Sequence, residues 1–184
     1  LNSIIMSFSN IMINSFMAKH GDLQLAGLGV AMKVNMIAVM LLIGVGTGIQ
    51  PLLGYCFGAG NSKRYRSVLK FSLCFAICLS IIMTLICYLG AAPLAKAFLD
   101  DEEAFGYAFA FSRIYIMSGP VLGILFVFIN AIQSMGAAIP SLILSVSRQG
   151  IIYFPILITT SIVNNTPVNL AMTQPITDYI ATAL

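Results

Sequence analysis

One acidic side chain lies inside an apolar segment of this sequence, where its type and position could support chemistry in a membrane. Asp178 belongs to the last segment of the chain, at about residues 167–184. A carboxylate in hydrocarbon is costly, so such a residue commonly handles an ion or solute, or pairs with another charge. We therefore expect Asp178 either to act on a solute that crosses the membrane or to be a structural acid, paired with a neighbouring helix or placed near the cytoplasmic rim.

Neutral polar side chains in the other apolar segments form a second group of candidates. An amide can hydrogen-bond a solute or a partner helix without carrying a full charge. A tyrosine among Met and Phe residues can line an adaptable wall that tolerates cations, or can simply pack. We expect a solute pathway to draw on this group, with helix packing as the alternative for each member: Asn14, Asn35, Gln50, Tyr55, Asn130 and Gln133.

The apolar segments lack the residues needed for a metal site or for covalent catalysis. Cys74 and Cys78 share a helix face, but no histidine or further thiol is placed to complete a tetrahedral site. An intramembrane protease would need a Ser-His pair, two aspartates or a His-Glu-x-x-His zinc motif. The sole histidine, His20, lies in a predicted loop. We therefore expect no metal, no cofactor and no enzymatic activity.

The composition predicts a membrane protein. Hydrophobic residues make up 59% of the chain and charged residues only 8%, whereas a soluble domain carries about 25% charged residues. Too few polar side chains are present to cover a globule in water, so the lipid bilayer is the expected environment. The net charge of +3 comes mostly from one short basic stretch and does not predict a nucleic-acid partner.

Apolar segments divide the chain into six expected membrane-spanning helices, because about 20 residues cross the hydrocarbon core. The second segment is too long for one straight crossing, and Gly44, Gly48 and Pro51 provide a place to bend. Gly119 and Pro120 predict a kink in the fourth. The expected fold is all-α, without a soluble domain, and its spans are about 1–17, 23–57, 68–98, 104–134, 140–163 and 167–184.

Glycines recur at the four-residue spacing that lets membrane helices approach closely. The run at 44–48 is not a dinucleotide-binding fingerprint, because its spacing is wrong and no strand precedes it. We expect either ordinary helix packing or a kinkable helix that lines a moving cavity at three pairs of positions: Gly44 and Gly48, Gly54 and Gly58, and Gly119 and Gly123.

Charged residues predict the orientation in the membrane. Acidic residues follow the third span, at 100–103, which places that loop outside the cell. Both ends of the chain are then expected on the cytoplasmic side, because six spans separate them. Bases in loops favour the cytoplasm, and the loop after the second span is expected to hold Lys63, Arg64, Arg66 and Lys70.

Four stretches together resemble the multidrug and toxic compound extrusion (MATE) family. A Gly-rich helix that runs through Gln-Pro into a Gly-Ala-Gly-Asn turn and a basic stretch resembles the end of the second helix of a MATE lobe. The other three stretches resemble the start of that helix, the junction of the fourth and fifth helices, and the last helix with its Pro-x-x-Asp. In that order they read "GIQPLLGYCFGAGNSKRYRSVLKFS", "LAGLGVAMKVNMI", "INAIQSMGAAIPSLILSVSRQGIIYFPI" and "QPITDYIATAL".

The resemblance implies one lobe of a two-lobe transporter with six helices in each lobe. Gln50-Pro51 and Arg148-Gln149-Gly150 resemble the second lobe, so we expect the C-terminal half, and the first residue is Leu, as in a fragment of a longer chain. The implied activity is antiport across the plasma membrane of a bacterium. Small organic, often cationic, compounds would leave in exchange for Na⁺ or H⁺, through a pathway between this lobe and its missing partner lobe.

Two departures leave alternatives open. Many members of the family use an acid in the first helix of a lobe to bind the coupling ion, but spans one and four hold none here. That acid is then expected in the other lobe, or Asp178 contributes. A related lipid-linked oligosaccharide flippase would need a strongly basic cavity, and only Arg113 and Arg148 are near. Arg148 is expected either to anchor at the interface or to pair with an acid across the cavity. A non-transporting membrane subunit or an intramembrane enzyme is the remote alternative.

Overall fold

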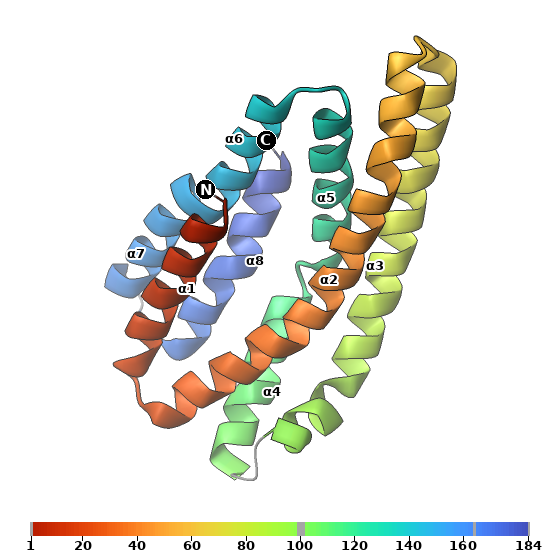
Figure 1. The fold of residues 1–184 in the computed structure, drawn as a ribbon. Coiled ribbons are helices and arrows are strands. Elements are labelled where there is room, and N and C mark those ends of the chain that lie inside the picture. Colours follow the sequence, from red (N-terminus) through yellow and green to blue (C-terminus); the bar gives the residue numbers. More distant parts are fainter. Residues whose placement is uncertain (1, 99–101, 164, 184) are drawn as a thin grey trace.

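The chain folds into a bundle of tilted helices (Figure 1). A computed structural model describes residues 2–98, 102–163 and 165–183, and within these ranges the chain is helical apart from short turns. In chain order the elements are α1 (Asn2–Ala18), α2 (Asp22–Gly58), α3 (Ser62–Phe98), α4 (Glu102–Ile116), α5 (Gly119–Ser134), α6 (Ala138–Val146), the π-helical segment η1 (Ser147–Ile151), α7 (Tyr153–Val163) and α8 (Pro167–Ala183).

These elements reproduce the all-α fold and the order of the expected spans. Over the described residues, α2, most of α3 and the α6–α7 unit are long and apolar enough to cross a membrane, and α4 with α5 forms a fourth, bent span. Helices α1 and α8 have 17 residues each, which is the lower limit of about 17 for a crossing. The division into six spans therefore remains a prediction at the first and last helices.

The prediction that a basic loop joins the second and third spans is wrong. The turn comprises only residues 59–61, and Lys63, Arg64, Arg66 and Lys70 lie in the first turns of α3. The physical reason is helix capping. Gly60 takes a left-handed φ of 66°, which ends α2, and the side chain of Asn61 accepts a hydrogen bond of 3.0 Å from the backbone N–H of Arg64, which starts α3 immediately.

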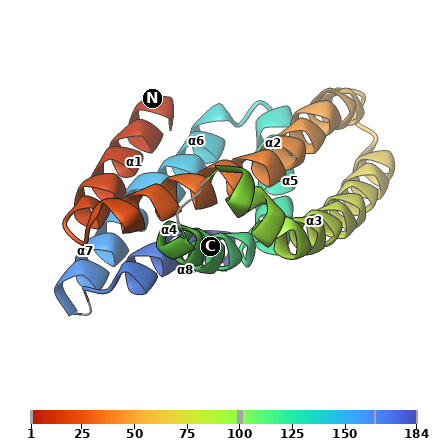
Figure 2. The same cartoon turned by 90° about the horizontal axis from the view of Figure 1, so that it is seen from below.

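Helix α2 forms the spine of the lobe. Its 37 residues correspond to about 55 Å, well beyond the 30 Å or so of the hydrocarbon core. In Figures 1 and 2 it runs between α1 on one side and α3 on the other. A fully buried apolar cluster joins α1, α2, α4, α7 and α8, with Ile13, Met17, Leu28, Phe111, Leu157 and Leu170 at its centre.

Close helix approaches occur at some glycines and not at others. A methyl group on Gly27 would meet the backbone nitrogen of Ala108 at 2.9 Å, so α2 and α4 are in contact there. Gly119 lies against Thr84, and Gly123 lies against the carbonyl of Ala76 in α3. The other candidates are looser: Gly54 has only Ser134 near it, and the described part of the chain places no atom within 4 Å of a Cβ at Gly44, Gly48 or Gly58.

A sharp bend lies next to Gly119 and Pro120, where a kink was expected. Helices α4 and α5 meet at 46°, and Pro120 stands in the first turn of α5, where its missing N–H costs nothing. The break frees the carbonyl of Met117, which accepts a hydrogen bond of 3.1 Å from Tyr179 in α8. Pro51, by contrast, lies within continuous α2.

Both ends of the described chain lie on the same side of the lobe as the α2–α3 turn (Figure 1). The end of α1, the start of α4 and the end of α7 lie on the opposite side. The basic residues of α3 and the two chain ends therefore share one side, as the expected topology requires. Of the acidic stretch expected on the other side, Asp100 and Asp101 lie outside the described residues.

Candidate functional site

A buried ion pair joins η1 to α8 through the side chains of Arg148 and Asp178. The Nε of Arg148 donates a hydrogen bond of 2.7 Å to Oδ1 of Asp178. The Asp178 side chain is completely buried and that of Arg148 is 10% exposed. Gln174, one helical turn before the aspartate, donates to the same oxygen at 3.3 Å. Of the two alternatives for Arg148, the structure shows the pairing with an acid.

The π-helical segment η1 presents Arg148 to this pair. Its wide turn is closed by a hydrogen bond of 2.8 Å from Ile152 N–H to the Ser147 carbonyl, five residues earlier. Pro155 follows in α7 and has no N–H to donate, which weakens regular α-helical bonding just before it. The carbonyl of Gln149 turns toward α1 and accepts a hydrogen bond of 2.6 Å from the Ser9 hydroxyl.

The guanidinium also contacts an aromatic ring of α5. Its central carbon stands 5.6 Å from the ring centre of Phe126, within the range of a cation–π interaction. The pair thus connects three elements, since Arg148 comes from η1, Asp178 from α8 and Phe126 from α5. The free energy of each contact is small beside the cost of leaving either charge unpaired in a medium of low dielectric constant.

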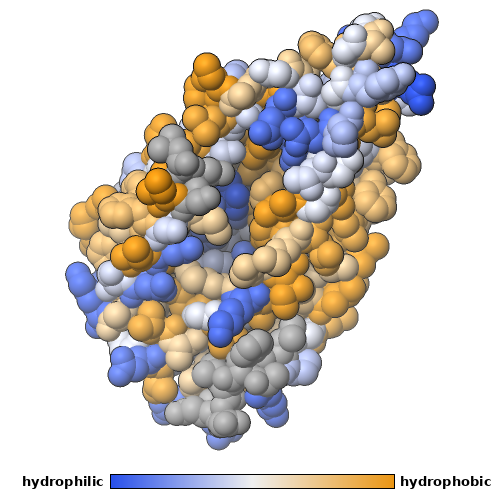
Figure 3. All heavy atoms as spheres, viewed as in Figure 1, coloured by the Kyte–Doolittle hydropathy of each residue, from blue (hydrophilic) through white to orange (hydrophobic). Residues whose placement is uncertain are grey.

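A cavity of about 330 Å³ opens in front of Arg148. Figure 3 shows the face of the lobe hollowed between α1 and α2, with hydrophilic residues inside the hollow. Asp178 is absent from the lining, because it lies behind the arginine. The lining combines polar and apolar side chains. It includes Ser9, Asn10, Asn35, Tyr115, Ser145, Arg148, Gln149, Tyr153 and Gln174 together with Met6, Met32, Met36 and Phe126.

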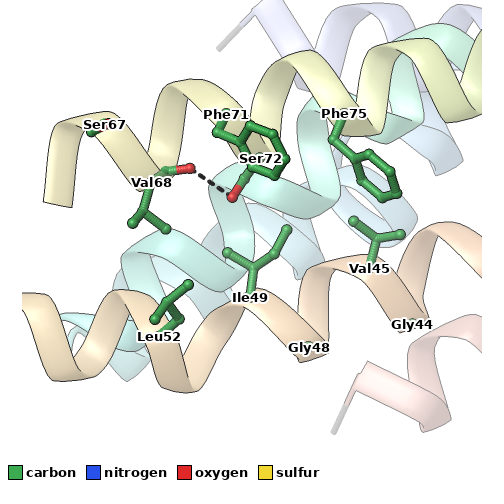
Figure 4. Close-up of a pocket in the computed structure, with 10 residues that line it drawn as sticks. All are labelled: Gly44, Val45, Gly48, Ile49, Leu52, Ser67, Val68, Phe71, Ser72 and Phe75. Carbon is green, nitrogen blue, oxygen red and sulfur yellow. Dashed lines mark hydrogen bonds between the residues drawn. The ribbon is translucent and has the colours of Figure 1, made fainter. Parts of the chain in front are cut away.

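A larger hollow of about 550 Å³ lies between α2 and α3, and it offers little chemistry. Figure 4 shows it walled by Val45, Ile49, Phe71 and Phe75. Its Ser72 hydroxyl donates to the carbonyl of Val68 at 2.7 Å (Figure 4), so that donor is already used. An apolar groove of this kind suits lipid or another apolar surface, and we place the candidate site in the smaller, polar cavity.

The structure brings only part of the predicted group together. Asn35 lines the cavity and Asp178 lies directly behind it. Asn130 is buried at the α2–α5 contact, where its amide nitrogen donates to Phe126 at 2.8 Å and faces Gly46. The other four candidates lie outside the lining of this cavity. Asn14, Tyr55 and Gln133 are exposed, and Gln50 is half-buried.

Sequence reasoning missed most of the polar lining. Asn10, Gln149 and Gln174 are amides in apolar segments, so the reasoning that selected Asn35 applies to them equally. Tyr115 and Tyr153 carry no such signal, since a buried tyrosine is common in helix packing. Over the described residues, no group of three His, Cys, Asp or Glu side chains could hold a metal ion.

Comparison with known proteins agrees with this architecture. The MatE family model matches residues 1–159. The chain belongs to the MATE family. This is a family of transporters and not of enzymes, and the chain is a multi-pass membrane protein similar to bacterial MATE exporters.

Two curated relatives and one solved structure illustrate the likeness. The Multidrug export protein MepA of Staphylococcus aureus is 26% identical over 162 residues, which cover 85% of this chain and 34% of MepA. MepA of Staphylococcus saprophyticus is 25% identical over 162 residues, which again cover 85% of this chain and 34% of that protein. The MATE transporter VcmN of Vibrio cholerae, in its bent form, matches with a TM-score of 0.89 at 18% identity, over 100% of this chain and 42% of VcmN.

These shares show that the chain spans about a third of the length of the curated relatives. The match to VcmN shows the fold, and it corresponds to one lobe of that transporter. The C-terminal ion pair lies partly beyond the family match, since Arg148 falls within residues 1–159 and Asp178 falls after them.

We predict that Ser9→Ala lowers the thermal stability of the full-length protein. The change removes the 2.6 Å hydrogen bond that links α1 to the partly buried Gln149 carbonyl, at a cost of roughly 0.5–1.5 kcal/mol. Ser15→Ala is the matched control, because the exposed Ser15 hydroxyl bonds only within its own helix, and its effect should stay within about 0.5 kcal/mol. Thermal unfolding of the purified protein measures both, and equal shifts would contradict the prediction.

Proposed function

We propose that this chain is the C-terminal lobe of a secondary multidrug exporter. The observation that carries the proposal is a MATE lobe with a polar, arginine-bearing cavity inside an otherwise apolar bundle. MepA is named as a multidrug export protein, which supports small organic compounds as the substrates. A second six-helix lobe would face this one, and the substrate would cross between the lobes as they open to each side in turn.

The coupling ion is Na⁺ or H⁺ in this proposal, and an inward gradient of that ion drives export. Helices α1, α5 and most of α4 contain no acidic residue, and the acids of α4 are confined to its first turn. Asp178 is held by Arg148, so a cation at this carboxylate would have to compete with a guanidinium. We therefore place the coupling acid in the partner lobe, with Asp178 shaping the cavity and contributing to transport through Arg148.

The flippase alternative fits the charges less well. A pyrophosphate group carries several negative charges, whereas Arg148 is the one charged side chain in the described cavity lining. Arg113 does not join it, because its guanidinium is clamped between the rings of Tyr88 and Phe109, 4.3 Å from each ring centre. A non-transporting subunit would have no need of a polar cavity in the bilayer.

We predict that the full-length protein in proteoliposomes moves the cationic dye rhodamine 6G only while an inward gradient of Na⁺ or H⁺ is present. Collapsing each gradient separately identifies the ion. Asp178→Asn should reduce the initial rate at least tenfold, because an unpaired Arg148 disturbs the cavity. Asp22→Asn, at the exposed start of α2, is the control and should leave the rate unchanged. Dye movement that needs neither gradient would refute the antiport proposal.

We also propose that the two chain ends and the α2–α3 turn face the cytoplasm. The exposed bases at the start of α3 support this orientation, since positive residues near span ends favour the inner side. A Lys63→Cys variant should react with a membrane-impermeant maleimide in inside-out vesicles and stay unlabelled in intact cells. The unsubstituted protein gives the background of the native cysteines. Labelling from outside intact cells would reverse the topology.

A further inference from the structure

We infer that the cavity in front of Arg148 binds the carboxylate of a small organic solute. This inference rests on the proposed function and adds a second class of solute to it, because it concerns compounds that carry a carboxylate, whereas the cationic dye of the transport test would cross without contacting Arg148. It rests on three features of the described residues. The guanidinium of Arg148 has N–H donors without a partner, Arg148 lies nearer the cavity than Asp178, and polar atoms around the cavity lack hydrogen-bond partners.

The guanidinium uses only part of its hydrogen-bonding capacity on Asp178. An arginine has five N–H donors, and among the described residues only the Nε donor of Arg148 has a hydrogen-bond partner. The contact is therefore single rather than the two-fold fork that arginine commonly makes with a carboxylate. The Asp178 Oδ2 oxygen correspondingly has no hydrogen-bond partner in the described residues. The terminal nitrogens of Arg148 remain for a second carboxylate.

The two charges are layered with the positive one toward the cavity. Arg148 belongs to the cavity lining, whereas Asp178 is fully buried behind it. Although the pair is neutral as a whole, a solute in the cavity meets the guanidinium first. An anionic group is attracted there, and a cationic group is repelled from the same position. Asp178 fixes the orientation of the guanidinium and offsets the cost of burying it when no solute is bound.

Unused polar atoms mark further contacts for the same solute. The hydroxyl of Tyr115, which is 3% exposed, has no hydrogen-bond partner in the described residues, and it can donate to a second carboxylate oxygen. Gln149 Oε1 is a buried acceptor that also lacks a described partner, and it suits an N–H on the solute. Buried polar atoms are rarely left unpaired, so two of them in one lining indicate a ligand or ordered water.

The size and walls of the cavity narrow the class of solute. About 330 Å³ is at the lower end of the range for small-molecule sites, roughly 300–1,000 Å³. Met6, Met32 and Met36 give an adaptable apolar wall for an aromatic or aliphatic body. A single guanidinium matches one carboxylate better than a diphosphate. The inferred ligand is thus a compact apolar compound with one carboxylate and a nearby N–H.

Three dansyl compounds of one scaffold test the inference. Dansylglycine has the carboxylate and a sulfonamide N–H, dansylglycinamide replaces the carboxylate by a neutral amide of the same shape, and monodansyl ethylenediamine carries an ammonium. We measure the binding of each by dansyl fluorescence, using the full-length protein in nanodiscs. The carboxylate should bind at least tenfold more tightly than the amide or the ammonium. Equal or weaker binding of the carboxylate would overturn the inference, without the need for any variant.

A paired variant assigns the preference to this cavity. Arg148→Gln with Asp178→Asn removes both charges together, which leaves no unpaired ion and keeps hydrogen-bonding groups in place. The tenfold preference should disappear in this double variant, and a thermal unfolding curve checks its folding. Arg113→Gln is the matched control, because it removes a membrane arginine outside the cavity, and it should retain the preference. A preference that survives the double variant would locate the carboxylate site elsewhere and overturn the inference.

Arg148→Lys provides an independent check if the double variant does not fold. It keeps the positive charge but loses the planar fork, so the carboxylate preference should fall without changing sign. An unchanged preference would contradict the role of the guanidinium. Binding and transport are separable in these experiments. Carboxylate-selective binding without gradient-driven movement of either the dye or dansylglycine would refute the proposed exporter and leave the site, whereas gradient-driven export without the preference would refute only the site.

Discussion

The cost of burying charge in a low-dielectric medium is the constraint on which this lobe depends. Arg148 and Asp178 lie in an environment where either alone would be strongly destabilising, and together they are tolerated because a 2.7 Å hydrogen bond joins them. That single contact fixes the position of η1 relative to α8, and the cation–π contact with Phe126 adds α5. The π-helical turn follows from the same constraint, since it brings the arginine to the aspartate while Pro155 interrupts regular bonding in the helix beyond.

The packing of the remaining helices leaves room for a polar cavity inside an apolar lobe. Helix α2 joins both sides of the bundle, and the buried cluster around Leu28 and Phe111 holds α1, α4, α7 and α8 against it. In front of the pair the helices diverge, and amides and hydroxyls line the opening. The lobe is closely packed where the core residues meet, and it is accessible where the arginine faces the cavity.

Much of the fold followed from the sequence, because long apolar segments and a Gly-Pro break are local signals. Asp178 was also found, since an acid in an apolar segment stands out. The sequence does not identify the partner of Asp178, and pairing with an acid is one of two alternatives for Arg148, because a contact between residues 30 positions apart depends on packing. The basic loop was wrong because Asn61 caps α3 earlier than hydropathy indicates. Hydropathy likewise places Asn14 and Gln133 in apolar segments but does not say which face of the helix they occupy. Of the predicted amides, only Asn35 lines the cavity.

A double-mutant cycle on Arg148 and Asp178 tests the central claim most directly. Thermal and denaturant unfolding of the full-length protein would be measured for Arg148→Met, Asp178→Leu and the two changes combined. If the pair is the constraint that organises the C-terminal helices, each single change costs about 3–5 kcal/mol, because it strands a buried charge. The combined change should then cost far less than the sum, with a coupling free energy of several kcal/mol. Additive effects would contradict the account, since they would mean that neither charge depends on the other.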